Sequence, residues 1–360
     1  MRRSVVSFLT VVAVAGSFAL AADVRREIQF PDLPEARTLK CDLHMHTVFS
    51  DGLVWPTVRV VEAWRQGLDA IALTDHIEYL PHKTDMNIKF NRSYELAEGT
   101  AKLRNILLVR GAEITRDTPP GHFNAIFLKD NTPLDTKDFY EVFDRAAKQG
   151  AFITWNHPGW QGLERGKWGE QQTRLFEKKQ LRAIEICNGD EYYPEAFPWA
   201  VERNLAVLGC SDEHEPFGDT PWTPENHRTL TLVFAKERTL DSLREAMFAG
   251  RTAAWWKNQL FGREEELAPL FAACVEVGPI RQRTDDRICV EIRNRCEMDI
   301  QLERDGKEKP IVTVLPAKAT SLVVFPAPKT GDPEPVNCRV TNFLIGPNKP
   351  LNVKLTFPRS

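Results

Sequence analysis

Apolar strand-like runs alternate with amphipathic helical stretches over residues 37–257. The pattern predicts strands at 39–43, 70–74, 106–113, 123–128, 152–156, 183–187, 206–210 and 230–234. Between them it predicts helices at 58–66, 94–104, 139–148 and 240–248, and Gly250 closes the last of these. Because strand and helix alternate so often within about 220 residues, we expect a parallel sheet that closes into an α/β barrel.

The pattern changes from about residue 272, where short alternating strands such as 288–292 and 320–325 are separated by Asp-Gly, Pro-Ala and Gly-Pro turns. Such spacing is typical of a small all-β sandwich, here of roughly 90 residues. The expected organisation is therefore a signal peptide at 1–21, a barrel at 22–265 and a C-terminal β-sandwich at 270–360.

The N-terminus has the order of a cleavable signal peptide: Arg2 and Arg3, then an apolar run over 5–20, then small residues up to Ala22. The alternative is an uncleaved membrane anchor, but the run is shorter than the roughly 20 residues that span a bilayer. No later segment is long and apolar enough to span one. We therefore expect a periplasmic or secreted protein with no stable membrane span after cleavage.

Composition limits the classes of function. The chain has 360 residues, of which 42% are hydrophobic and 27% charged, enough for an enzyme-sized core and a second, smaller domain. Its formal net charge is −3, and removing Arg2 and Arg3 makes it −5, with no basic tract remaining. A nucleic acid polymer is therefore not an expected partner.

The seven cysteines fall into two groups. Cys41, Cys187 and Cys210 lie in apolar predicted strands, where a thiol packs as a small hydrophobic group. In an exported protein the C-terminal four could form disulfides, with three possible pairings, and we expect one or two at most. These four are Cys274, Cys289, Cys296 and Cys338.

Histidines and carboxylates follow one predicted strand after another: His44, His46, Asp75, His76, Glu113, His157, Asp212 and His214. His122 instead precedes a strand. Because the carboxyl ends of barrel strands converge on one mouth, these residues are expected to meet there. Imidazole and carboxylate ligands suit zinc, iron or manganese, and the absence of cysteine argues against a closed structural zinc site. The pattern indicates a multinuclear hydrolytic centre.

The polar residues form an ordered series of motifs: Cys41-Asp42-Leu43-His44-Met45-His46, Ser50-Asp51-Gly52, Thr74-Asp75-His76, Gly111-Ala112-Glu113, Gly121-His122-Phe123-Asn124, Asn156-His157-Pro158 and Ser211-Asp212-Glu213-His214. The series resembles that of the polymerase and histidinol phosphatase (PHP) family, over roughly residues 38–256. The resemblance implies a distorted seven-stranded (β/α) barrel, a trinuclear metal site and the hydrolysis of phosphate esters.

The resemblance also implies a ligand set for three divalent ions of zinc, manganese or iron. The first metal takes His44, His46, Glu113 and Asp212; Glu113 bridges to a second, bound by His122 and His157; the third takes Asp51, His76 and His214. Two metals about 3.5–4 Å apart generate a bridging hydroxide, so no side-chain nucleophile is needed. Asp75 and His214 are the expected catalytic residues. Asp75 either orients a ligand or carries a proton; alternatively it only caps the next helix.

Substrate-binding residues are expected at the barrel mouth. Arg165 and Lys167 lie on a glycine-rich loop after His157 and could bind phosphate, although surface cations are usually only solvated. Asn188 could contact substrate or merely form a turn. The nearby aromatic residues could stack on a sugar or base, with core packing as the alternative. They are Trp155, Trp160, Trp168, Tyr192, Tyr193, Trp199 and Trp222.

The leading hypothesis is a metal-dependent phosphatase or phosphodiesterase that acts on a small organic phosphate outside the cytoplasm. The first alternative is a hydrolase or lyase with the same barrel that acts on another kind of bond. The second is a non-catalytic metal-binding protein of the cell envelope, in which the β-sandwich contacts a glycan or an envelope partner.

Overall fold

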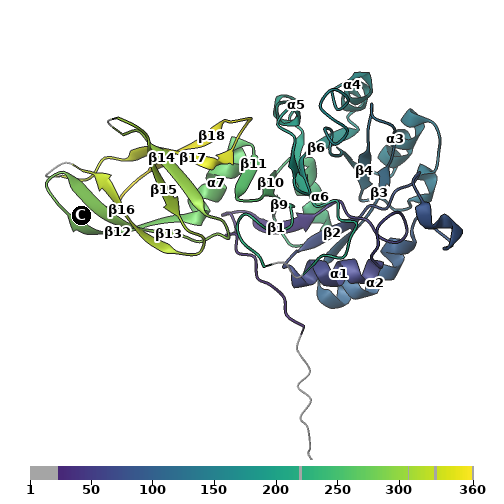
Figure 1. Ribbon diagram of the computed structural model, residues 1–360, viewed down its shortest axis with the longest axis horizontal. Coiled ribbons are helices and arrows are strands. Elements are labelled where there is room, and N and C mark those ends of the chain that lie inside the picture. The colour runs from purple at the N-terminus through teal and green to yellow at the C-terminus, as the bar shows by residue number, and fades with distance from the viewer. Residues whose placement is uncertain (1–22, 219–220, 307, 328–330, 359–360) are drawn as a thin grey trace, which may run out of the picture.

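The computed structural model describes residues 23–218, 221–306, 308–327 and 331–358. The predicted signal peptide at 1–21 lies outside these ranges. Figure 1 shows an α/β part beside an all-β part. The α/β part is a barrel of β1 (Arg37–Asp42), β2 (Ala70–Leu73), β3 (Leu107–Ile114), β4 (Phe123–Ile126), β5 (Phe152–Trp155), β6 (Leu181–Asn188) and β8 (Ala206–Cys210).

Neighbouring barrel strands are parallel except at β4, which runs antiparallel to both β3 and β5. Residues 115–122 are the whole connection from β3 to β4, whereas a parallel crossover needs a dozen or more residues. The sheet therefore departs from the expected parallel order at this strand. Because β4 is reversed, His122 at its start lies at the same end of the barrel as the carboxyl ends of the other strands.

The barrel closes at its mouth between the segments that follow β1 and β8. The backbone N–H of Asp212 donates to the His44 carbonyl over 2.9 Å, and that of His46 donates to the Glu213 carbonyl over 3.0 Å. Met45 and Glu213 form a parallel bridge. Two segments distant in sequence are thus joined where both carry histidine and carboxylate side chains.

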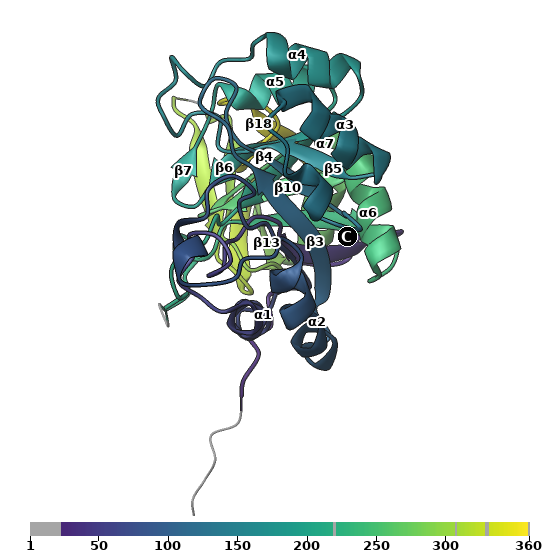
Figure 2. The same ribbon diagram turned by 90° about the vertical axis from the view of Figure 1, so that its right-hand side faces the viewer.

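Helices cover the outside of the barrel, as Figure 2 shows. They are α1 (Pro56–Arg65), α2 (Arg92–Arg104), α3 (Phe139–Lys148), α4 (Glu170–Glu177), α5 (Ala196–Glu202) and α6 (Leu240–Phe248), with short 3₁₀ turns η1 (Pro81–Thr84) and η2 (Thr132–Leu134). Helix α3 begins after Asp138, whose carboxylate accepts from the N–H of Glu141 over 2.7 Å. It buries Val142, Phe143 and Ala146 against the strands. The four predicted helices correspond to α1, α2, α3 and α6.

An antiparallel extension leaves the barrel beside β1. It consists of β9 (Leu230–Ala235), β10 (Thr252–Trp256) and β11 (Gln259–Gly262), while β7 (Glu191–Tyr192) forms a short hairpin with β6. Hydroxyl groups of the extension satisfy the backbone of β8. The N–H of Gly209 donates to Thr231 Oγ1 over 3.1 Å, and that of Val207 donates to Thr252 Oγ1 over 3.2 Å.

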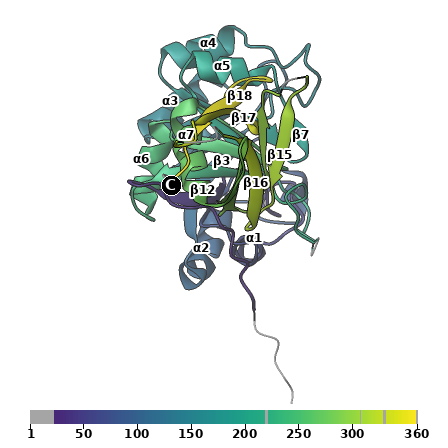
Figure 3. The ribbon, with the colours of Figure 1, turned by 90° about the vertical axis from the view of Figure 1, so that its left-hand side faces the viewer.

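The C-terminal part is an all-β sandwich, seen end-on in Figure 3. One sheet has the order β12 (Val275–Arg283), β13 (Arg287–Asn294), β16 (Thr320–Pro326). The facing strands are β14 (Ile300–Arg304), β15 (Ile311–Leu315), β17 (Val336–Leu344) and β18 (Pro350–Leu355). Alternate residues of β13, namely Ile288, Val290 and Ile292, are buried between the sheets. The predicted fold class, an α/β barrel followed by a β-sandwich, is confirmed.

The two parts share one hydrogen-bonded sheet. Strand β11 of the barrel extension pairs in parallel with β17 of the sandwich, with Leu260 opposite Phe343. Helix α7 (Glu264–Cys274) covers the predicted boundary, and its side chains Leu267, Leu270 and Phe271 belong to the same buried cluster as Phe343. The parts are therefore continuous in both backbone pairing and core.

All seven cysteines are free thiols, so none of the possible C-terminal disulfides forms. Cys41, Cys187 and Cys210 are fully buried in their strands, as expected for packing groups. Among the residues that the structure describes, no helix combines the length and apolar character needed to cross a bilayer.

Candidate metal centre

The barrel mouth brings together all nine residues for which a metal-binding role was predicted. His44 and His46 follow β1, Asp51 lies in the loop beyond, and His76 follows β2; Glu113 is in β3, His122 precedes β4, His157 follows β5, and Asp212 and His214 follow β8. Their donor atoms form overlapping groups, each with all atoms within 4.8 Å of one another.

The innermost group consists of His44, His46, Glu113 and Asp212. Asp212 Oδ1 lies 3.1 Å from His44 Nε2 and 3.0 Å from His46 Nε2. Glu113 Oε2 lies 3.4 Å and 3.3 Å from the same two nitrogen atoms. Both imidazole rings are fully buried, so their lone pairs face the carboxylates and not solvent.

Glu113 connects this group to a second one through its other oxygen. Glu113 Oε1 lies 3.2 Å from His122 Nδ1 and 3.4 Å from His157 Nε2. Asp212 Oδ2 also approaches His157 Nε2, at 3.7 Å. One carboxylate with a separate set of imidazoles at each oxygen has the form of a bridging ligand.

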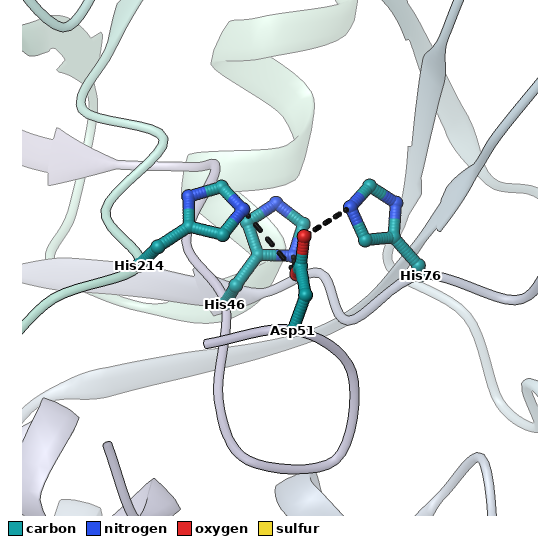
Figure 4. Close-up of side chains that lie close together, drawn as sticks. All are labelled: His46, Asp51, His76 and His214. Carbon is teal, nitrogen blue, oxygen red and sulfur yellow. Dashed lines mark ion pairs between the residues drawn. The ribbon is translucent and has the colours of Figure 1, made fainter. Parts of the chain in front are cut away.

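A third group surrounds Asp51, as Figure 4 shows. Its Oδ2 lies 3.4 Å from His76 Nε2, and its Oδ1 lies 3.3 Å from His214 Nε2. His46 Nδ1 lies 3.6 Å from Asp51 Oδ1, so His46 is the fourth member of this group. The His46 ring therefore presents one nitrogen to the innermost group and the other to this one.

Three oxygen atoms in the cluster fit metal coordination better than hydrogen bonding. Asp51 Oδ1, Glu113 Oε2 and Asp212 Oδ1 are buried and have no hydrogen-bond partner among the described residues. Leaving a buried carboxylate oxygen unsatisfied is costly, and metal coordination is one way to satisfy it. Nitrogen and oxygen donors without sulfur suit zinc, iron or manganese.

The electrostatics of the cluster favour ionised carboxylates. Burial opposes charge on Glu113, but the neighbouring rings of His76 and His44 hold its pKa well below the ordinary value. The same balance with His44 and His46 lowers the pKa of Asp212. Burial and the charge of His76 lower the pKa of His46 to about 4, whereas for His44, His76, His157 and His214 the nearby carboxylates outweigh burial and raise the pKa.

Glu185 is a candidate supporting residue that the sequence analysis missed. This fully buried carboxylate lies with Oε1 2.8 Å from His44 Nδ1. Its Oε2 accepts from the backbone N–H of His157 over 3.1 Å and from Asn188 Nδ2 over 2.9 Å. A carboxylate on the outer nitrogen of a metal-binding histidine fixes the orientation of the ring. The available signal was a charged residue in the middle of the apolar run 183–187.

Asp75 holds the loop after β1 that carries Asp51. Its Oδ1 accepts from the N–H of Thr47 over 2.7 Å and from Ser50 Oγ over 3.0 Å, and both of its oxygens lie 2.9 Å from Thr47 Oγ1. The loop then turns tightly at Gly52, where a Cβ atom would lie 2.7 Å from the His46 carbonyl carbon. These contacts describe a residue that positions a loop.

Two ligands have unusual backbone conformations. His157 has φ 24° and Asp212 has φ 54°, a region that residues other than glycine seldom adopt. The hydrogen bonds from their N–H groups, to Glu185 and to the His44 carbonyl, hold them there. Strain of this kind collects at functional sites.

The predicted substrate-binding residues lie farther out. The Arg165 and Lys167 side chains are exposed, and Lys167 Nζ pairs with Glu164 Oε2 at 2.6 Å. Within the described ranges, neither side chain contacts a candidate ligand. Asn188 is half-buried and donates to Glu185, so its contact is with a residue that supports the ligands.

Two exposed aromatic rings border the cluster. Trp160 is 47% exposed, and its ring centroid lies 5.4 Å from that of His122 and 5.8 Å from that of His157. Tyr79, 53% exposed, lies 5.7 Å from His76. Trp155, Trp168, Tyr192, Tyr193 and Trp199 instead pack in or against the barrel core, and Trp222 packs against the core shared with the sandwich.

Comparisons with known proteins agree with this fold. A solved two-domain protein from Bacteroides vulgatus ATCC 8482 that contains a predicted PHP-like metal-dependent phosphoesterase is 44% identical. The match covers 93% of this chain and 99% of that one, with a TM-score of 0.87. The chain therefore belongs to this family of two-domain PHP-like proteins. The family model of an Ig-like domain matches residues 275–356, which are the sandwich.

Other similarities are weaker. A candidate metal-dependent phosphoesterase from Bifidobacterium adolescentis ATCC 15703 is 17% identical over 60% of this chain and 98% of that one, with a TM-score of 0.41. An amidohydrolase from Chromobacterium violaceum is 16% identical over 50% of this chain and 92% of that one, with a TM-score of 0.36. A search of curated proteins found no match.

Proposed function

We propose that this protein hydrolyses a phosphate mono- or diester of a small organic molecule at a centre of three divalent metal ions. The observation that carries the proposal is Glu113, a buried carboxylate whose two oxygens face separate sets of imidazoles. His44, His46 and Asp212 would complete the first position, His122 and His157 the second. Asp51, His76 and His214 would form the third.

Metals held at these positions would activate water and neutralise the charge that develops on phosphate oxygens. Neighbouring side chains hold the candidate ligands in position for this role. Glu185 orients His44, and Asn156 Nδ2 donates to Glu113 Oε1 over 2.9 Å. His214 has the most exposed ring of the ligand set, with 34% of its side chain accessible, so we propose that it also faces the leaving group.

Two other functions make different predictions. A hydrolase or lyase acting on a non-phosphate bond would bind metals fully yet release no phosphate from any ester. A non-catalytic envelope protein would bind metals, turn over nothing and contact a glycan or partner through its sandwich. The buried, ordered ligand set favours a catalytic centre, and the family favours phosphate esters.

A metal analysis followed by a phosphate-release screen of mono- and diesters tests the proposal directly. We expect up to three equivalents of zinc, manganese or iron, and turnover that chelation removes. His122→Ala and Asp212→Asn should each abolish turnover while the protein stays folded by circular dichroism. His82→Ala, which removes a histidine outside the ligand set, is the matched control and should keep activity. Near-normal turnover in either ligand variant would contradict the assignment.

We also propose that the protein is exported. The support is the order of charged, apolar and small residues at 1–22. N-terminal sequencing of protein secreted by the native cells should begin near Ala22. A chain that retains Met1 would instead indicate an anchor.

A further inference from the structure

A cavity of about 510 Å³ lies beside the candidate metal centre and is not used by the proposed reaction. Its wall includes Ser211 and Glu213, which alternate along the chain with the ligands Asp212 and His214. The rest comes from the N-terminal segment, the end of α1, Gly189 and Asp190 after β6, the residues before β9, and Leu230 at its start. The volume lies within the range of about 300–1,000 Å³ that is usual for small-molecule sites.

Arg228 is the distinctive group of this cavity. Its side chain is only 2% exposed, and its Nη1 donates to Asp42 Oδ2 over 3.0 Å. The guanidinium lies 4.4 Å from the centre of the Phe217 ring. Its Nε and Nη2 atoms are buried and have no hydrogen-bond partner in the part of the chain that the structure describes. A buried cation with two unsatisfied donors is costly unless something binds them.

The two unsatisfied atoms form one edge of the guanidinium. Nε–H and Nη2–H point in the same direction, which is the fork that binds the two oxygens of a carboxylate or phosphate side-on. Asp42 Oδ2 takes the opposite nitrogen, Nη1, so Asp42 does not engage this edge. Asp42 is also fixed, because it accepts from Ser211 Oγ over 2.5 Å. The fork is therefore preorganised for a planar oxyanion.

A second arginine supports the same interpretation. Arg26 lines the cavity with its guanidinium 3.9 Å from the centre of the Trp222 ring, and it is ion-paired with Glu297. Its Nε is also buried without a partner among the described residues. Two cations stacked on aromatic rings thus border one cavity, each with a donor left over.

The remaining lining decides which oxyanion fits. Glu62 is engaged by Arg59 Nη1 and by the N–H of Phe217, each over 3.0 Å. Glu213 accepts from the N–H of Glu215 over 3.2 Å, and burial raises its pKa against the opposing charges of Arg228 and Arg59. These carboxylates offset the arginines and disfavour a dianion such as phosphate. Apolar lining from Ile28, Leu68 and Leu230 suits a hydrophobic body.

We propose that this cavity binds a small monocarboxylate with an apolar or aromatic body, held side-on by Nε and Nη2 of Arg228. The site is separate from the metal centre, and the inference does not depend on the proposed phosphoesterase activity. A bound carboxylate would complete the hydrogen bonding of Arg228, and Phe217 and Trp222 would pack against its body.

Isothermal titration calorimetry of the full chain with benzoate tests the proposal, with benzamide as the uncharged probe of similar shape. We expect saturable binding of one benzoate and at least about tenfold weaker binding of benzamide, because a charge-assisted fork is lost. Arg228→Lys keeps a cation for Asp42 but removes the fork, so it should also weaken benzoate about tenfold or more. If that variant fails to fold, Trp222→Ala replaces it and should weaken benzoate at least about threefold.

The metal centre is excluded as the binding site by repeating the titration after chelation and with His122→Ala. Benzoate binding should persist in both, even though turnover is lost. Loss of binding on chelation, equal affinity for benzoate and benzamide, no benzoate binding by the native chain, or saturable uptake of inorganic phosphate at this arginine in its place would each overturn the proposal.

Discussion

At the scale of single residues, the centre depends on groups that hold ligands as well as on the ligands. Glu185 is the clearest case, since it contacts His44 and the backbone of His157 at once. We expect Glu185→Gln to lower activity about 10–100-fold, the usual cost of losing such a support. Metal content by mass spectrometry should fall in parallel. Glu164→Gln, at an exposed position, is the control and should change neither quantity.

The left-handed backbone at Asp212 makes a prediction about stability. In metal-free protein, we expect the free energy of unfolding of Asp212→Gly to exceed that of Asp212→Ala by about 1 kcal/mol. The reason is that φ 54° strains the backbone of alanine but not that of glycine. Asp241, in the first turn of α6, supplies the reference. There the order should reverse, since glycine in a helix is about 0.5–1 kcal/mol worse than alanine. Urea unfolding of the four variants measures both differences. The same order of stability of glycine and alanine at both sites would refute the explanation.

The sequence identified donor atoms more reliably than the residues around them. His44, Glu113 and Asp212 belong to compact motifs that are visible without coordinates. Glu185 was hidden in a strand, because a one-dimensional pattern does not show which face of a strand meets the centre. Lys167 was singled out by charge and loop position, but its nearest partner is Glu164. Long exposed side chains take their partners from local surroundings that spacing does not encode.

At the scale of elements, the loop after β1 behaves as a unit anchored by Asp75. We expect Asp75→Asn to loosen the loop, because an amide has one acceptor oxygen where Thr47 and Ser50 now use a carboxylate. The third metal position, built on Asp51, should lose affinity first. Equilibrium dialysis should then show about one fewer equivalent of metal under limiting supply. An unchanged metal content with a lower kcat would instead support a proton-carrying role for Asp75.

Trp160, in the loop after β5, is expected to affect substrate preference. Its half-exposed ring contacts the His122 and His157 rings, so it can also meet the organic part of an ester bound there. We expect Trp160→Ala to raise KM about five- to tenfold for an aryl phosphate with a smaller effect for an alkyl phosphate, because stacking is worth about 0.5–1.5 kcal/mol. Steady-state kinetics on the two esters measures this. Equal changes for both would show that the ring only packs.

Hydrophobic periodicity predicted where the strands and helices lie along the chain. It did not predict the directions of the strands or the long-range pairing between them. The runs at 70–74 and 206–210 became β2 and β8 with little change. The reversal of β4 was not expected, because periodicity is the same for either strand direction. The closure between Met45 and Glu213 depends on long-range pairing that no local pattern records.

At the scale of the whole molecule, the barrel and sandwich should unfold together. Phe343 is fully buried, faces Leu260 across β11 and β17, and packs against Phe271 at 6.2 Å. We expect Phe343→Ala to cost about 3–5 kcal/mol and to lower the melting temperature of the barrel as well as the sandwich. Calorimetry should show one transition in both proteins. Leu322→Ala, at a 64% exposed position, is the control. A separate barrel transition at the original temperature would refute the shared unit.

The pairing of β11 with β17 also sets an order of events during synthesis. Strand β11 ends at Gly262, but its partner is complete only at Leu344. While the intervening chain is being made, the edge of β11 has no strand beside it, and such an edge invites pairing with other chains. The nascent protein therefore passes through a stage in which all the barrel strands have been made but the outer edge of the β9–β11 extension is unpaired. The exposure ends when β17, made late in synthesis, pairs with β11.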